Sequence, residues 1–377
     1  MAQLKIGICG GGVGGMAAAI ALRKAGHEAE VYEQTASYQR VGADINLTPN
    51  AVRALDSLGV VPMLKETAAR PTHRISRMWD TGEVTSKLEM SDAAEEKYGA
   101  PQLTVHRADL LNALRVQLPK EAIKLGHRAE AIDNIENKPK VRFTNGATDE
   151  FDVLVGADGI HSLTRMTLFG PDQPQFTGLV SYRSVVDRSK LSLPNLDAFT
   201  KWWGPTPDMQ IVTFPLNRGR ETFVFATTPQ ADWLHESWTM AGDVEELRRT
   251  YATFHPEARA LLDACESVTK SALYIRDPLP AWSVGRVTLL GDACHPMVPF
   301  MAQGACMAIE DSVVLGRVFD GVGESGIAAA LKSYENTRKA RTARVQIGSR
   351  GNEWLREGGN ADWVYGYDAT SVSLEAA

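Results

Sequence analysis

The stretch Leu4-Lys5-Ile6-Gly7-Ile8-Cys9-Gly10-Gly11-Gly12-Val13-Gly14-Gly15 decides the fold of this 377-residue chain. A short apolar run of buried-strand type leads directly into the glycines, and 16–25 has the composition of a helix. Gly10 permits the tight turn, Gly12 lets a pyrophosphate approach the backbone, and Gly15 lets helix and strand pack closely. The free N–H groups at the helix start then face the phosphates. We therefore expect a strand–turn–helix unit that binds a dinucleotide.

A second strand is expected over 28–32, ending at Glu33 and followed by Gln34. A carboxylate at this position can accept hydrogen bonds from ribose hydroxyls and disfavours a 2′-phosphate. The run Gly321-Val322-Gly323-Glu324-Ser325-Gly326 has the same glycine spacing, but it follows a helical stretch. Because the motif works only between a strand and a helix, we interpret this second copy as an interhelical loop.

The composition is that of a globular protein, with 44% hydrophobic and 23% charged residues and a net charge of −6. The absence of a basic run argues against nucleic-acid binding. No stretch offers about twenty apolar residues, so no membrane span is expected. The four cysteines show neither a CxxC pair nor zinc spacing. We expect reduced thiols in a cytoplasmic protein, and no metal site.

The character of the sequence changes at about residue 176, where strand-like runs begin to dominate. Such runs cover 179–186, 209–214 and 222–227 and predict an inserted, mainly antiparallel sheet. A buried-strand pattern returns at 287–290, before two helical stretches. We therefore predict an α/β fold: a Rossmann-like domain from 1–175 and 279–377, which includes C-terminal helices, and a substrate-binding β-sheet domain over 176–278.

Two further motifs follow the glycine loop. The first, Asp158-Gly159-Ile160-His161-Ser162-Leu163-Thr164-Arg165, matches the pattern DGxxSxxR, and the second is Gly291-Asp292-Ala293-Cys294-His295-Pro296. With these motifs in this order, nearly the whole chain resembles the single-component flavoprotein aromatic hydroxylases of the para-hydroxybenzoate hydroxylase fold. The resemblance implies tightly but non-covalently bound FAD. It also implies NADH or NADPH as a transient co-substrate without a second dinucleotide domain.

The resemblance also implies the residues of the flavin site. Asp292 follows a strand, where its carboxylate can accept from the ribityl hydroxyls, and Pro299 and Gly304 lead into a helix whose N–H groups would face the flavin N1–C2=O edge. His295 and His106 are interpreted as structural turn residues. The expected cofactor-binding residues are Gly10, Gly12, Gly14, Gly15, Glu33, Gln34, Arg40, Arg107, Asp158, Asp292, Pro299, Gly304 and Ala305.

The reaction that the resemblance implies is aromatic hydroxylation. The nicotinamide reduces FAD, oxygen adds as a C4a-hydroperoxide, and its distal oxygen passes to an activated ring. An electron-rich ring is needed, so a proton acceptor for a ring hydroxyl is expected. A flavin-dependent NAD(P)H oxidase or dehydrogenase without oxygen insertion remains the alternative. A non-enzymatic flavin-bound sensor is disfavoured, because no segment looks like an output module. The enzyme is expected to be a monomer or a homodimer.

Local similarity points to the 6-hydroxynicotinate 3-monooxygenase subgroup, with salicylate hydroxylase nearby. It is carried by Lys201-Trp202-Trp203, by 301–311 and by 363–368. The polar pocket groups of the hydroxynicotinate enzymes are replaced here, so we expect a related hydroxylated aromatic or N-heteroaromatic acid, hydroxylated with or without loss of its carboxylate. Asp208 is a candidate proton acceptor, although a plain turn carboxylate is the equal alternative. The expected pocket residues are Asn46, Tyr182, Phe199, Val212, Phe214 and Phe300.

Overall fold

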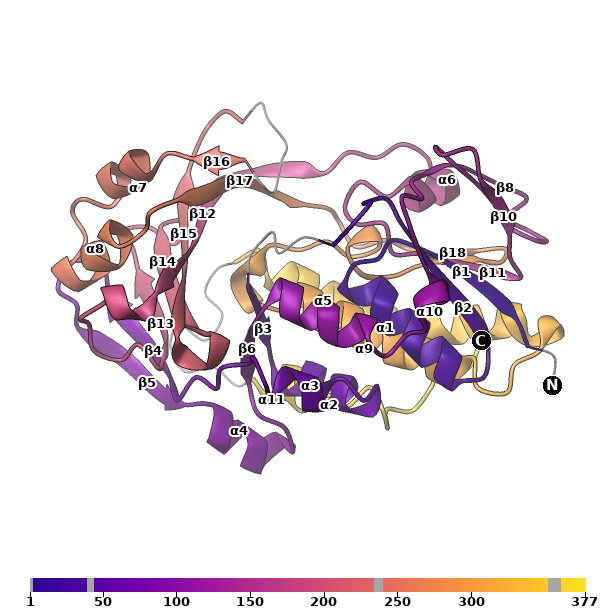
Figure 1. Ribbon diagram of the computed structural model, residues 1–377, viewed down its shortest axis with the longest axis horizontal. Helices are drawn as coiled ribbons and strands as arrows, with labels where there is room; N and C mark the ends of the chain where they lie inside the picture. The colour runs from indigo at the N-terminus through magenta and orange to yellow at the C-terminus, as the bar shows by residue number, and fades with distance from the viewer. Residues whose placement is uncertain (1–2, 39–43, 234–239, 352–360) are drawn as a thin grey trace.

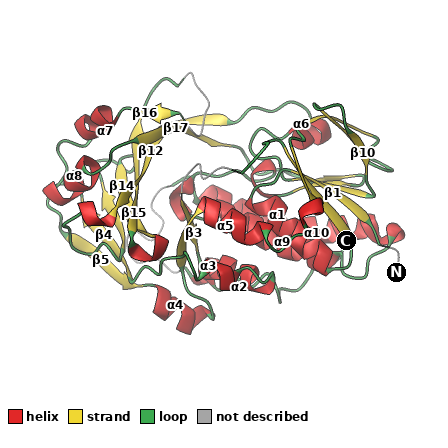
Figure 2. Ribbon diagram, viewed as in Figure 1, coloured by secondary structure: helices red, strands yellow, loops and turns green. Residues whose placement is uncertain are grey.

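The computed structural model describes residues 3–38, 44–233, 240–351 and 361–377. Two parts lie side by side: an α/β part near the chain termini and a second part built around a large sheet (Figure 1). Helices gather in the first part and the longest strands in the second (Figure 2). Both parts of the expected α/β architecture are therefore present.

The α/β part is built around β1 (Lys5–Cys9), whose Ile6 and Ile8 are fully buried. β1 pairs in parallel with β2 on one side and with β11 on the other. Strand order thus reverses at β1, which is where open α/β sheets form their ligand crevices. The sheet order β18-β19-β11-β1-β2-β7 corresponds to Ser283–Val284, Val287–Leu289, Val153–Gly156, Lys5–Cys9, Glu28–Glu33 and Ile123–Leu125.

Two different layers cover this sheet. On one face lie α1 (Val13–Lys24) and α9 (Gly304–Val318), and α10 (Ile327–Gly348) packs on α9. On the other face lies a small sheet of β8 (Ala129–Asp133), β9 (Lys140–Phe143) and β10 (Thr148–Glu150). The second glycine run lies between α9 and α10, which confirms its interpretation as an interhelical loop.

The second part is an eight-stranded sheet in the order β16-β17-β12-β15-β14-β13-β4-β5. Its strands are Ala241–Gly242, Val268–Ile275, Gln175–Asp187, Glu221–Pro229, Gln210–Leu216, Phe199–Trp203, His73–Met78 and Val84–Glu89. The predicted range 176–278 is incomplete, because β4 and β5 come from the first part of the sequence. β4 pairs in parallel with β13, and no local sequence pattern predicts this long-range pairing.

Shorter elements join the two parts. In Figure 1, the β3–β6 pair lies between the α/β layers and the large sheet, α5 lies alongside α1, and α7 and α8 lie on the outer side of the large sheet. Among the residues described, no helix combines the length and apolar character needed to cross a membrane. The shorter elements are β3 (Asp44–Leu47), α2 (Pro49–Ser57), α3 (Val61–Leu64), α4 (Ser91–Tyr98), β6 (Leu103–His106), α5 (Arg107–Arg115), α6 (Leu163–Phe169), α7 (Val244–Thr250), α8 (Pro256–Asp263) and α11 (Asp362–Tyr365).

Candidate cofactor and substrate site

The glycine loop is packed so tightly that most of its positions exclude a side chain. A Cβ atom on Gly15 would lie 1.9 Å from the carbonyl oxygen of Gly10, and one on Gly10 would lie 2.2 Å from that of Ala157. Gly10 also has φ of 110°, which glycine adopts readily. A Cβ on Gly14 would lie 2.6 Å from Leu290, beside the third motif. The loop therefore requires its glycines for packing at three positions.

Gly12 differs from Gly10, Gly14 and Gly15, because a Cβ there would meet no protein atom within 4 Å apart from those of its chain neighbours. Gly12 is the N-cap of α1, and no side chain caps this helix. Uncapped N–H groups at a helix start favour an anion. Beside them, Glu33 accepts hydrogen bonds from the N–H groups of Gly11 at 2.7 Å and Thr35 at 2.8 Å. The space over Gly12 thus fits the pyrophosphate of a dinucleotide, and Glu33 fixes the loop that would hold it.

The second motif begins with a carboxylate that is engaged within the protein. Asp158 accepts hydrogen bonds from Ser162 Oγ at 2.5 Å and from the N–H and Oγ1 of Thr164 at 3.0 and 3.1 Å. Burial raises the pKa of Asp158, and these hydrogen bonds oppose the rise. In this structure Asp158 shapes the turn that follows β11.

Arg165, at the end of the second motif, holds the third motif in place. Its guanidinium is 4% exposed and donates to the carbonyl oxygens of Ala293 and Cys294 at 3.4 and 3.1 Å. It also pairs with Asp172 at 2.7 Å, and Arg276, which directly follows β17, reaches the same carboxylate at 2.5 Å. The two motifs are therefore one structural unit.

Asp292 opens into a narrow recess formed by the second motif, the third motif and β17. Its side chain reaches solvent, yet the surrounding protein excludes enough water to raise the pKa of its carboxyl. His295 and Arg107 oppose that rise, so Arg107 lies within electrostatic range of Asp292. A Cβ on Gly304 would lie 4.0 Å from Asp292 Oδ1. The structure thus brings together three predicted cofactor residues, Asp292, Arg107 and Gly304.

The N-terminus of α9 lacks a side-chain cap, as does the N-terminus of α1. The first turn of α9 contains no acidic residue. The preceding Gln303 is fully buried and directed elsewhere, donating to Thr48 Oγ1 at 2.9 Å and accepting from Asn50 at 3.2 Å. The first N–H groups of α9 are therefore available to the electron-rich edge of a ligand.

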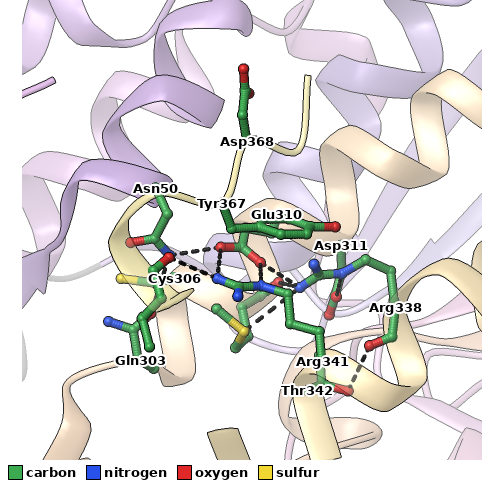
Figure 3. Close-up of polar contacts among 12 residues, drawn as sticks. Asn50, Gln303, Cys306, Glu310, Asp311, Arg338, Arg341, Thr342, Tyr367 and Asp368 are labelled. Carbon is green, nitrogen blue, oxygen red and sulfur yellow. Dashed lines mark hydrogen bonds and ion pairs between the residues drawn. The ribbon is translucent and has the colours of Figure 1, made fainter. Parts of the chain in front are cut away.

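A buried ion network lies further along α9 (Figure 3). Arg338 of α10 pairs with Glu310 and Asp311 of α9, each at 2.7 Å, and all three side chains are fully buried. Arg341 makes a two-point pair with Glu310 at 2.8 and 2.9 Å. The ring of Tyr367 lies 3.8 Å from the guanidinium of Arg341. The network fixes α9 against α10 and ties both helices to the C-terminal segment.

The same network reaches the third motif through His295. Its Nε2 lies 2.5 Å from Asp311 Oδ2, and its side chain is buried. Burial would raise the pKa of Asp311, but His295 and Arg338 together hold it below its ordinary value. This contact supports the structural interpretation of His295. His106 likewise accepts from the N–H of Ala108 and caps α5.

The large sheet has two faces with different neighbours. Residues on its outer face pack with α7 and α8. The other side, which we call the inner face, carries Phe199, Val212 and Phe214 in one apolar cluster, and the rings of Phe199 and Phe214 stack 5.3 Å apart. Phe300 joins Leu179 in a neighbouring cluster where the α/β part meets this face. Four of the predicted pocket residues therefore lie on or against the inner face.

Tyr182 is a correction to the predicted pocket. It lies in the outer cluster with residues of α7 and α8. Successive side chains of a strand point to opposite faces. The inner face therefore receives the next residue of β12, Arg183, whose guanidinium lies 5.4 Å from the ring centroid of Phe225.

The remaining predicted residues have varied positions. Asn46 of β3 accepts from Gln102 Nε2 at 2.6 Å. Asp208 is exposed in the turn between β13 and β14, where its backbone carbonyl accepts from Thr227 Oγ1 at 2.9 Å. Gln34 is exposed, and Arg40 lies outside the described residues. The others lie in the elements already described: Pro299 borders the recess and Ala305 lies in the first turn of α9.

Two charged residues on strands of the two parts were not found from the sequence. Asp44, at the start of β3, is half-buried, and its charge and that of Arg183 act on each other. Strand alternation could have placed Arg183 on the inner face, since Val180, Tyr182 and Val186 form the apolar side of β12. Asp44 stands two residues before Asn46, the separation of side chains on one face of a strand.

Comparison with known proteins agrees with a dinucleotide cofactor site. Residues 3–348 match the model of the FAD binding domain family. The chain is 38% identical to 6-hydroxynicotinate 3-monooxygenase of Bordetella bronchiseptica, over 98% of this chain and 97% of that protein. It is 34% identical to 3-hydroxybenzoate 6-hydroxylase of Polaromonas naphthalenivorans, over 93% and 87% of the two chains. A salicylate hydroxylase substrate complex superposes with a TM-score of 0.84 at 26% identity, covering 97% of this chain and 96% of that one.

These matches extend over nearly the whole chain and include both parts of the fold. They agree with the geometry of the site, in which the start of α1 beside Gly12, the recess at Asp292 and the uncapped start of α9 fit one extended cofactor. The chain belongs to the FAD binding domain family, among its FAD-dependent aromatic monooxygenases.

Proposed function

We propose that this enzyme hydroxylates a small aromatic or N-heteroaromatic acid that carries a ring hydroxyl, using NADH or NADPH and O2. The observation that carries the proposal is the pairing of cations with aromatic rings on the inner face. Arg183 lies 5.4 Å from the ring of Phe225, and Arg74 lies 5.7 Å from that of Phe199. A flat apolar surface bordered by cations suits an anionic aromatic ring.

The relatives support the same substrate class. The named substrates of the 6-hydroxynicotinate, 3-hydroxybenzoate and salicylate enzymes are all small hydroxylated aromatic acids. The inner face of this chain is rich in phenylalanine, with Phe199, Phe214, Phe223 and Phe225 in one cluster. A pocket that lacks the hydrogen-bonding groups of a relative selects poorly for that relative's substrate. We therefore favour a benzoate-type ring over 6-hydroxynicotinate itself.

Bound FAD would supply electron transfer from the nicotinamide and activation of dioxygen. The residues of the chain would hold and orient it. The uncapped start of α1 beside Gly12 would bind the phosphates, Asp292 would accept from ribityl hydroxyls, and the start of α9 would face the polar edge of the ring. The inner face would position the substrate ring and exclude water from the cleft.

The test uses the FAD-loaded enzyme with NADH and NADPH and a panel of hydroxybenzoates and hydroxypyridine carboxylates. We expect one acid to accelerate NAD(P)H oxidation and to yield a product with one added oxygen atom that derives from labelled dioxygen. The amide of that acid is the matched uncharged control and should stimulate far less. Hydrogen peroxide as the sole product with every compound would instead favour an NAD(P)H oxidase.

A further inference from the structure

Two adjacent carboxylates of α9, Glu310 and Asp311, lie at the centre of the buried network in Figure 3. Both side chains are fully buried, and both pair with the guanidinium of Arg338. Their remaining contacts lead to different places. Those of Asp311 lead to the turn that bears Asp292, and those of Glu310 lead to the residue that begins α9. The two acids therefore connect with two separate parts of the cofactor site.

Asp311 holds the turn of the third motif at two points. Its Oδ2 atom lies 2.5 Å from Nε2 of His295 and accepts from the N–H of Gly291 at 3.4 Å, and its Oδ1 atom accepts from Arg338 at 2.7 Å. Within the turn, the N–H of His295 donates to the carbonyl oxygen of Gly291 at 2.8 Å. Asp292 directly follows Gly291, so a fully buried carboxylate anchors the backbone on both sides of it.

Glu310 is connected to the start of α9 through Asn50 of α2. The Nδ2 atom of Asn50 donates to Glu310 Oε1 at 2.7 Å and to Gln303 Oε1 at 3.2 Å. Gln303 is the N-cap residue of α9, and its Nε2 atom donates to Thr48 Oγ1 at 2.9 Å. Thr48 in turn donates to Asn50 Oδ1 at 2.6 Å. All four side chains are fully buried, so water does not compete for these hydrogen bonds.

These hydrogen bonds keep the Gln303 side chain away from the helix that it begins. An acceptor oxygen at the N-cap can bind the N–H groups of the first turn, and it then competes with a ligand for them. Gln303 makes no such bond, because Asn50 and Thr48 bind both ends of its amide group. The first N–H groups of α9 thus stay open, and a helix N-terminus stabilises negative charge. An open helix start therefore favours the reduced, more negative form of a flavin over the oxidised form.

We propose that Glu310 and Asp311 are positioning residues for FAD, each acting on a different part of it. Asp311 fixes the Asp292 turn, which would bind the ribityl chain, and so determines how tightly FAD is held. Glu310 orients Asn50, which keeps Gln303 off the N–H groups of α9, and so raises the reduction potential of bound FAD. Neither effect involves the substrate, so both can be measured whichever aromatic acid the enzyme hydroxylates.

The first experiment measures the reduction potential of bound FAD in Asn50→Ala. Removing the Asn50 amide frees Gln303 Oε1 to accept from the first turn of α9, in competition with FAD. We expect the affinity for reduced FAD to fall about tenfold relative to that for oxidised FAD, which lowers the midpoint potential of this two-electron couple by about 30 mV. Equilibrium reduction of the FAD-loaded enzyme against a reference dye gives the potential. A midpoint within about 5 mV of wild type would overturn the role of Glu310 and Asn50.

A double variant separates this effect from a general loss of packing. Methionine is similar in length to glutamine, and its sulfur is only a weak acceptor. In Asn50→Ala combined with Gln303→Met, no strong acceptor is left to cap α9, so the midpoint potential should return to within about 10 mV of wild type. A potential as low in the double variant as in Asn50→Ala would show that capping by Gln303 is not the cause. Asn50→Ser, which keeps a polar group in the buried site, makes the same comparison if Asn50→Ala does not fold.

The second experiment measures the affinity for FAD in Asp311→Asn. The amide nitrogen that replaces one oxygen cannot accept a hydrogen bond, so the turn that bears Asp292 is held less firmly. We expect the Kd for FAD to rise about tenfold. The midpoint potential should shift by less than about 10 mV, because the ribityl chain has the same charge in oxidised and reduced FAD. Unchanged affinity, or a shift in potential as large as that of Asn50→Ala, would refute the separate role of Asp311.

Tyr251→Phe is the control for a general loss of stability. The hydroxyl of Tyr251 is buried in the outer cluster of the large sheet and donates to the carbonyl oxygen of Thr227 at 2.5 Å. Without this bond the variant should melt at a lower temperature than wild type, yet its Kd for FAD should stay within about twofold. A loss of FAD affinity of about tenfold in Tyr251→Phe as well would show that overall stability, and not Asp311, determines binding.

Discussion

Substituting Gly12 with alanine tests the cofactor site directly. The structure leaves the space over this residue free of protein atoms, so a methyl group there would contact the bound ligand alone. The backbone of Gly12 has φ −75° and ψ −173°, which alanine adopts without strain. Gly12→Ala should therefore fold normally without cofactor and bind FAD weakly.

The expected loss can be estimated from the contacts at the start of α1. Hydrogen bonds to a charged group contribute about 1.5–3 kcal/mol each. If the methyl group displaces the phosphates from one such bond, the Kd for FAD should rise by roughly 10- to 150-fold. The assay is titration of apoprotein with FAD, followed by quenching of flavin fluorescence, alongside thermal unfolding of the apoprotein.

Gly15→Ala is the matched comparison. Its Cβ would collide with the carbonyl oxygen of Gly10 at 1.9 Å, so this variant should lose stability even without FAD. Gly12→Ala should keep the melting temperature of the wild-type apoprotein. Wild-type FAD affinity in a normally folded Gly12→Ala variant would refute the placement of the phosphates over Gly12.

Three further outcomes test the site and its support. Arg338→Met leaves Glu310 and Asp311 buried with one fewer cation, which should lower the free energy of unfolding by about 3–5 kcal/mol. Since the unfolding entropy is about 0.8 kcal/mol/K for this chain length, calorimetry should show a melting temperature lower by about 5 °C. A fall in melting temperature of less than about 1 °C would contradict this prediction. Asp311 has a lowered pKa in the folded state, so its contribution to stability is present above the ordinary carboxyl pKa of about 4 and is lost as the pH falls below that value. Urea midpoints measured from pH 5 to pH 3 should therefore decline less in Asp311→Asn than in wild type. Asp292→Asn should weaken FAD binding by about tenfold, because an amide is a poorer acceptor for ribityl hydroxyls than a carboxylate; unchanged affinity in the fluorescence titration would remove Asp292 from the cofactor site.

The parts of the site that the sequence predicted are those with a local signature. The glycine loop, the Asp158 turn and the Asp292 turn each combine a strand end with residues that only one backbone shape accommodates, such as Gly10 at positive φ. In the structure these motifs follow β1, β11 and β19, which are neighbouring parallel strands whose ends meet at one edge of the sheet. Arg165 shows why the second and third motifs occur together, because it binds the backbone of Cys294.

The parts that were missed depend on contacts distant in the sequence. Nothing near β4 indicates that it pairs with β13, and the interaction of Asp44 with Arg183 joins residues of different domains. Tyr182 was assigned to the wrong face because its aromatic character outweighed the strand alternation. The buried network escaped notice for another reason: Glu310 and Arg338 are residue types normally found on helix surfaces.

The discontinuous sheet also has a consequence for synthesis of the protein on the ribosome. β11 is complete at Gly156, but β19, which pairs with it, begins only at Val287, roughly 130 residues later. At ordinary elongation rates of about 5–20 residues per second, the nascent chain waits on the order of ten seconds with one edge of β11 unpaired. An unpaired strand edge of this kind promotes association between chains. Holdase chaperones should therefore bind nascent chains that end before β19 and release them once α9 has been made.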